Sequence, residues 1–143
     1  MVLKRLVIYA LLFAFSYCIA LASYWMGLLL FYRQTPTDIV FITFSIGMAF
    51  VVFLVPVYST LLMFLRVFRR HTSLLIQTLL LLVPSLLAIA ATGPFGPGLL
   101  MMPFSNEASL FYFAYGVSAV CFSLASWQTE KLLKGHSVDR KPL

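Results

Sequence analysis

The sequence predicts an all-α membrane protein with four transmembrane helices in two antiparallel hairpins and with cytoplasmic N- and C-termini. Of its 143 residues, 62% are hydrophobic and only 10% are charged, whereas soluble domains carry about a quarter charged residues. Four apolar runs each reach the roughly 20 residues that cross a bilayer. We therefore expect a single domain with spans at about 6–32, 39–65, 72–92 and 108–128, followed by a basic tail at 129–143.

The distribution of Lys and Arg predicts the orientation of these spans. Short loops rich in Lys and Arg stay on the cytoplasmic side of a membrane. Nine of the ten basic residues precede the first span, lie in the middle loop that contains Arg66, Arg69 and Arg70, or lie in the tail, and only Arg33 falls in another loop. The middle loop and both termini are thus expected in the cytoplasm, with Arg33 on the outer side.

The first span has two interpretations. Lys4 and Arg5, an apolar stretch and Ala20-Leu21-Ala22 resemble a secretory signal peptide with its cleavage motif. The apolar run, however, continues to Tyr32, which is longer than a signal peptide needs and long enough for a transmembrane helix. We expect an uncleaved first helix.

The second and third spans each contain a proline. The second follows a turn at Pro36, with Thr37 or Asp38 as its N-cap, and Thr72 or Ser73 is the predicted N-cap of the third. Pro56 and Pro84 lie 14 residues on either side of Arg70, so that an antiparallel pair places them at similar depth. Each proline frees one backbone carbonyl. The two prolines indicate either a deformable layer or ordinary membrane-helix prolines whose neighbours satisfy the freed groups, and we favour the second interpretation.

A run of glycines and prolines at 93–98 is predicted to end the third helix. The apolar segment 99–104 that follows is too short to span, so we expect it at the membrane surface or partly inserted. Ser105 or Asn106 is the predicted N-cap of the fourth helix. The aromatic residues 111–115, together with this segment, indicate either an interfacial aromatic belt or a docking surface.

Catalysis, metal binding and cofactor binding are not expected. The four predicted spans contain no Asp, Glu, Lys, Arg or His, which proton-coupled transport requires. Cys18 and Cys121 lie inside apolar runs and are interpreted as packing residues rather than as a disulfide. Asp38 and Glu107 suit helix N-termini better than a catalytic carboxylate pair. The net charge of +6 fits topology and anionic lipid, and nucleic acid is not an expected partner.

Small residues recur at helical spacing in the first and fourth spans. The two stripes are Ser16, Ala20, Ser23 and Gly27, and Ser109, Gly116, Ala119, Ser123 and Ser126. Such stripes let helices approach closely in a membrane. They serve either packing within the bundle, which we favour, or an external partner.

These observations favour a non-catalytic, multi-pass protein of a bacterial cytoplasmic membrane that binds another integral membrane protein and modulates or blocks it. Immunity proteins, conjugative exclusion proteins and accessory subunits have this size and topology. The candidate partner-binding residues are the cations of the middle loop and tail and four apolar residues: Arg66, Arg69, Arg70, Lys131, Lys134, Arg140, Lys141, Leu99, Met101, Met102 and Phe104. Membrane lipid is the other expected partner, since a basic juxtamembrane tail also binds anionic headgroups.

Two alternatives remain open at this level. A small homo-oligomeric channel, holin-like pore or carrier would use Gln77, Pro56 and Pro84 to line its path. A membrane enzyme would depend on Asp38 or Glu107. The same features also suit the membrane of a eukaryotic organelle.

Overall fold

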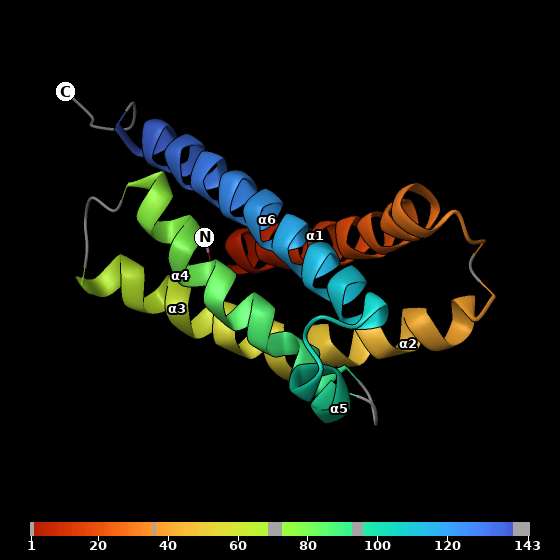
Figure 1. Cartoon of the computed structure of the whole chain (residues 1–143). Coiled ribbons are helices and arrows are strands. Elements are labelled where there is room, and N and C mark those ends of the chain that lie inside the picture. The colour runs from red at the N-terminus through yellow and green to blue at the C-terminus, as the bar shows by residue number, and fades with distance from the viewer. Residues whose placement is uncertain (1, 36, 69–72, 93–95, 139–143) are drawn as a thin grey trace.

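Every regular element that the structure describes is a helix. The computed structural model describes residues 2–35, 37–68, 73–92 and 96–138. Its elements, in chain order, are α1 (Val2–Tyr32), α2 (Ile39–Ala49), the π-helix η1 (Phe50–Leu54), α3 (Val55–Phe68), α4 (Leu74–Leu87), the 3₁₀-helix η2 (Ala88–Ala91), α5 (Gly96–Met101) and α6 (Asn106–Val138) (Figure 1).

Four helical segments are long and apolar enough to cross a membrane. They are Arg5–Tyr32, Ile39–Leu65, Leu74–Ala91 and Asn106–Leu132. The second segment runs through α2, η1 and α3, and the third through α4 and η2. This confirms a four-helix, multi-pass membrane protein.

The helices define two ends of the molecule. At the terminal end lie the first turn of α1, the end of α3, the start of α4 and the last turns of α6. At the connection end, α1 joins α2, and α5 precedes α6 (Figure 1). The positive-inside argument predicts that the terminal end faces the cytoplasm.

The helix α6 is the centre of the bundle, because it packs along both α1 and α4. Small residues let α1 approach α6: Ser16 and Ala20 are fully buried, and a Cβ atom added to Gly27 would lie 2.9 Å from Leu110 Cδ2. Close to Gly27, the rings of Phe31 and Phe113 meet edge to face with centroids 5.7 Å apart. The small-residue stripe of α1 therefore packs inside the bundle, as favoured from the sequence.

The stripe predicted on α6 has a mixed outcome. Ala119, Ser123 and Ser126 are fully buried. Ser109 is exposed, and no atom lies within 4 Å of a Cβ added to Gly116. The stripe faces the core only along its second half, where α6 lies between α1 and α4.

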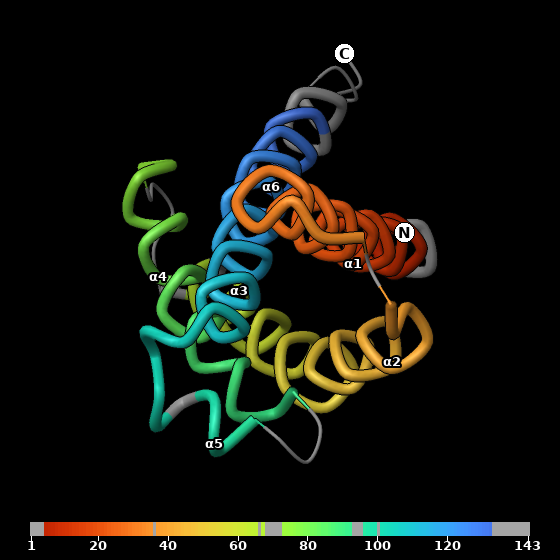
Figure 2. Tube along the Cα trace, turned by 45° about the vertical axis from the view of Figure 1, so that its right-hand side comes forward, coloured from red at the N-terminus to blue at the C-terminus, as the bar shows by residue number. Residues whose placement is uncertain are grey.

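The sequentially adjacent helices α1 and α2 contact each other much less than α1 contacts α6. Their principal contact is near the middle of α1, where the Tyr17 hydroxyl donates a hydrogen bond to the Thr43 carbonyl oxygen over 3.0 Å. The Tyr17 ring also packs edge to face on Phe50. In Figure 2 α1 lies next to α6 and above α2.

Both prolines adjoin a departure from α-helical geometry. The π-helix η1 ends two residues before Pro56, and the 3₁₀-helix η2 begins four residues after Pro84. Because proline lacks an amide hydrogen, the helix before it has a carbonyl without its usual donor, and π-turns are one accommodation. A short hydrogen bond between the hydroxyls of Tyr58 and Ser85 joins the two helices next to the prolines, which agrees with the similar depth expected for them.

Several predicted helix ends can be compared with the structure. Ser73 caps α4, since its Oγ accepts from the Ile76 amide over 3.4 Å, and Ser105 Oγ accepts from the Ala108 amide over 3.2 Å. Asp38 occupies the N-cap position of α2, but its side chain forms no capping hydrogen bond. Thr72, the other candidate cap of α4, and Pro36, the predicted turn residue, lie outside the described residues.

Two boundaries differ from the prediction. The run at 93–98 was expected to end the third helix, and η2 does end before it, at Ala91, but Gly96, Pro97 and Gly98 form the first part of a further helix, α5. Proline is tolerated there because first-turn amides lack helical partners. The fourth helix was expected to end near Gln128, but α6 continues to Val138. Ten residues of the predicted tail therefore extend this helix.

Candidate partner-binding surface

Most of the predicted basic residues fall outside what the structure describes. Arg69, Arg70, Arg140 and Lys141 lie outside the described residues. Arg66 and Lys134 lie on α3 and α6, but their side chains are not among those described. The prediction that these cations contact a partner is therefore carried by the sequence alone.

Lys131 is the tail cation whose side chain is described. It is exposed, and its Nζ lies 3.7 Å from the centre of the Trp127 ring one turn earlier on α6, which is a cation–π contact. Beside it, Glu130 Oε1 accepts a 2.7 Å hydrogen bond from the Tyr9 hydroxyl of α1. The terminal end thus joins α1 to α6 through a polar contact at the level of the tail.

The apolar candidates lie together at the connection end. Met101, Met102 and Phe104 are 85%, 70% and 95% exposed, and we call these three residues the 101–104 patch. Leu99 differs from them, because it is half-buried against the hydrophobic core. The structure therefore brings three of the four predicted apolar residues to the surface, whereas Leu99, within α5, packs against the core.

The backbone around α5 explains this exposure. A Cβ added to Gly96 would lie 2.5 Å from the Ala90 carbonyl oxygen and 2.6 Å from that of Ile89, so α5 packs directly on the backbone of η2. The Met102 amide then donates to the Gly98 carbonyl, and the Ser105 amide donates to the Met102 carbonyl, each over 3.1 Å. These turns hold the patch between two anchored helices, away from the core.

The aromatic residues predicted to extend this surface are mostly interior. Phe111 and Tyr115 are buried, and their rings stack with centroids 6.2 Å apart. Phe113 is exposed, whereas Tyr112 is half-buried. The expected belt or docking surface over 111–115 is thus reduced to one exposed ring, because this stretch of α6 packs against α1.

Several polar side chains of α4, η2 and α6 bind one another across the helices. Gln77 Nε2 donates to Ser126 Oγ over 2.8 Å, and the Thr92 and Tyr115 hydroxyls are also 2.8 Å apart. Thr78 and Ser123 form a further pair of hydroxyls 2.8 Å apart between α4 and α6. Buried polar groups paired in this way stabilise helix contacts in a membrane. The arrangement does not resemble the hydrated lining of a path.

The acidic residues and cysteines in the described ranges do not form a common site. They contain no group of three His, Cys, Asp or Glu side chains that could hold a metal ion. Asp38 and Glu107 are both exposed, each at the start of a helix. Both cysteines are free thiols, and Cys18 is exposed on the bundle surface rather than packed as predicted, because its side of α1 faces away from α6.

Comparisons of this chain with known protein families, with curated proteins and with solved structures found no match. The support for the candidate surfaces therefore comes from the exposure and contacts of the residues in this chain.

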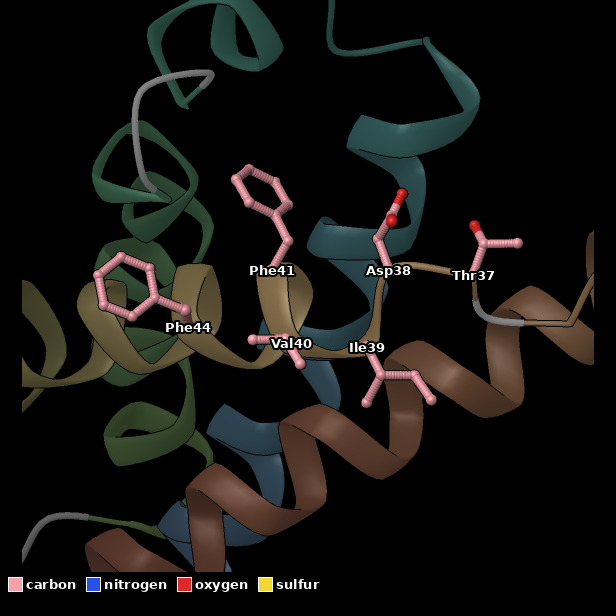
Figure 3. A pocket seen from close by; sticks show the side chains of 6 residues that line it. All are labelled: Thr37, Asp38, Ile39, Val40, Phe41 and Phe44. Carbon is pink, nitrogen blue, oxygen red and sulfur yellow. The ribbon is translucent and has the colours of Figure 1, made fainter.

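One feature of the connection end was missed from the sequence. A shallow, open pocket of about 540 Å³ at the start of α2 is lined by exposed residues: Thr37, Asp38, Ile39, Val40, Phe41 and Phe44 (Figure 3). From the sequence alone, Asp38 is a helix cap or a candidate catalytic carboxylate, and the residues from Ile39 onward are membrane span. The apolar residues that follow Asp38 indicate such a pocket only when the position of α2 relative to α1 is known.

Proposed function

We propose that this chain is a non-catalytic membrane protein that binds another integral membrane protein and modulates or blocks it. An immunity protein, a conjugative exclusion protein or an accessory subunit of a bacterial cytoplasmic membrane would act in this way. The proposed contact is the 101–104 patch, with the cations of the middle loop and the tail as a second contact at the terminal end.

The observation that carries this proposal is the exposure of Met101, Met102 and Phe104 outside the four membrane-crossing segments. Lipid covers exposed apolar side chains within a span, whereas Met101 ends α5 and Met102 and Phe104 lie on the connection between α5 and α6. Methionine and phenylalanine are enriched at protein interfaces, and flexible methionines adapt to a partner's surface. A partner that covers the patch buries these three exposed apolar side chains.

A homo-oligomeric channel or carrier is less well supported. Its proposed lining residue Gln77 is buried and hydrogen-bonded to Ser126, and Pro84 is buried. A path through these residues would break contacts between α4 and α6.

Site-specific photocrosslinking in native membranes tests the proposal. A photoreactive amino acid replaces Met102 or Phe104 in the full chain, and crosslinked products are identified by mass spectrometry. We expect one membrane protein to be captured from both positions. Met63, which is 67% exposed on α3, is the matched control within a span and should capture mainly lipid.

Paired substitutions give the second arm. Met102→Ser combined with Phe104→Ser should abolish co-purification of that protein in mild detergent, whereas the same change at Met63 should preserve it. Crosslinks only to lipid from both patch positions, or a homo-oligomer that conducts solute in liposomes, would contradict the proposal.

A further inference from the structure

Met101 and Met102 differ from the other described methionines in their surroundings. The chain has six methionines, and five of them fall in the described ranges. Met26, Met48 and Met63 are 56%, 40% and 67% exposed, but each lies within a membrane-crossing segment, where lipid covers it. Met101 and Met102 are 85% and 70% exposed, and they lie between the third and fourth of these segments. Among the described methionines, these two are therefore the ones whose thioethers lie outside a span.

The residues that follow the pair indicate that water reaches this part of the chain. Asn106 and Glu107 begin α6, and both are exposed. A carboxylate within the hydrocarbon of a membrane is costly, so Glu107 places the first turn of α6 at a level that water and headgroups reach. The Ser105 amide donates to the Met102 carbonyl oxygen over 3.1 Å, which ties Met102 to the same level.

A chemical change at the two sulfur atoms does not disturb the packing of α5. Within this helix, Leu99 packs against the hydrophobic core, and a Cβ added to Gly96 would meet the backbone of η2. Met102 is held through its backbone, because its amide donates to the Gly98 carbonyl oxygen over 3.1 Å. The side chains of Met101 and Met102 are mostly exposed instead. They can therefore become polar while the fold is kept.

Methionine has an oxidation chemistry that changes its polarity reversibly. A sulfur lone pair attacks one oxygen of hydrogen peroxide, the O–O bond breaks, and the proton on the transferred oxygen passes to the departing hydroxide. Sulfur loses two electrons and the peroxide gains them, so the products are methionine sulfoxide and water. Methionine sulfoxide reductases restore the thioether, with thiols supplying the two electrons and the oxygen leaving as water.

We propose that Met101 and Met102 form a reversible oxidation site for hydrogen peroxide, which switches the 101–104 patch between an apolar and a polar form. Each sulfoxide adds a polar S=O group to the patch and leaves Phe104 as its apolar side chain. Oxidation of methionine-rich interfaces disrupts them, so the oxidised patch releases its partner. This last consequence rests on the proposed function, whereas the modification itself does not.

Oxidation kinetics in a bilayer test the site. The full chain in lipid nanodiscs is treated with hydrogen peroxide, and the sulfoxide at each methionine is quantified over time by tandem mass spectrometry. We expect Met101 and Met102 to react at least about tenfold faster than Met26, Met48 and Met63, because susceptibility follows exposure to the aqueous oxidant. Reductases for both sulfoxide epimers should then restore the two thioethers in the folded chain. In urea with sodium dodecyl sulfate, all five methionines should react at similar rates.

Partner capture tests the effect of the modification. A photoreactive amino acid at Phe104 reports the protein bound to the patch in native membranes, and peroxide should lower this capture at least about fivefold. Met101→Leu combined with Met102→Leu removes both sulfur atoms at nearly constant volume, so its capture should resist peroxide. Met101→Gln combined with Met102→Gln should lower capture without peroxide. The control Met63→Leu should remain as sensitive to peroxide as the unsubstituted chain.

Equal oxidation rates for the five methionines in nanodiscs would overturn the site, as would sulfoxides at Met101 and Met102 that the reductases leave in place. Loss of helicity on oxidation, measured by circular dichroism, would also overturn it. An equal loss of capture in the chain with Met101→Leu and Met102→Leu would show that the switch lies elsewhere. If the reduced chain captures no protein, the proposed function fails, and the oxidation rates alone decide the modification site.

Discussion

Ser16 of α1 and Ser118 of α6 form a reciprocal pair in the interior of the bundle. Their hydroxyl oxygens are 2.7 Å apart, and Ser118 Oγ also lies 3.0 Å from the Ser16 carbonyl oxygen. Both residues are almost completely buried. Small size lets the helices approach, and the hydroxyls then bind one another because no water reaches them. At this scale one residue type provides both close packing and specificity.

A double-mutant cycle on this pair tests that interpretation. Ser16→Ala and Ser118→Ala should each lower the free energy of unfolding, with a coupling energy of about 0.6 kcal/mol and at most about 1.7 kcal/mol, as for other hydrogen bonds between membrane helices. Unfolding of the detergent-solubilised protein with sodium dodecyl sulfate provides the measurement.

The control for the cycle is Ser59→Ala. Ser59 is exposed, and its hydroxyl donates a hydrogen bond to the Val55 carbonyl oxygen one turn earlier, so its loss should change stability by less than about 0.5 kcal/mol. Strictly additive effects of the Ser16 and Ser118 substitutions would show that the pair does not act as a unit.

At the scale of elements, α5 and η2 form one packed unit that determines where the 101–104 patch lies. The helix α5 has only six residues, which is too short to be stable alone. Its position depends on the contact of Gly96 with the backbone carbonyls of Ile89 and Ala90. A side chain at residue 96 cannot be accommodated by a rotamer change, because the atoms that it would meet belong to the backbone.

The matched substitutions Gly96→Ala and Gly98→Ala test this packing. Gly96→Ala should destabilise the protein by about 1–3 kcal/mol through overpacking. Gly98→Ala should be close to neutral, since no atom lies within 4 Å of its added Cβ. A cysteine at Leu99, introduced after Cys18→Ala and Cys121→Ala, should react faster with a maleimide in Gly96→Ala than in Gly98→Ala. Equal reaction rates would mean that α5 does not depend on this contact.

For the whole molecule, the asymmetric distribution of Lys and Arg predicts the sidedness of the two ends. In a background without Cys18 and Cys121, we expect Gln34→Cys at the connection end to react with a membrane-impermeant maleimide in intact spheroplasts. His136→Cys in the tail should react only after permeabilisation. The opposite pattern would show that the nine cations lie outside and would require another explanation for the orientation.

The sequence was sufficient to predict the four membrane-crossing segments, because crossing a bilayer demands length and apolarity that no soluble segment needs. It also predicted that Pro56 and Pro84 lie at similar depth, and it named Ser73 and Ser105 among the candidate N-caps. These features depend on the chain within one helix or one short connection. The candidate patch was predicted in part: Met101, Met102 and Phe104 are exposed, but Phe111 and Tyr115 are buried.

The tertiary structure alone decided which helices pack together. Composition gives α1 and α2 the same apolar character, and the short connection between them suggests a closely packed hairpin. In the structure α1 instead packs along α6, where Ser16, Ala20 and Gly27 allow a close approach, and it contacts α2 much less. The reason is that in lipid every apolar face is satisfied equally well, so side-chain shape and hydrogen bonding choose the neighbours, and these depend on residues about a hundred positions apart.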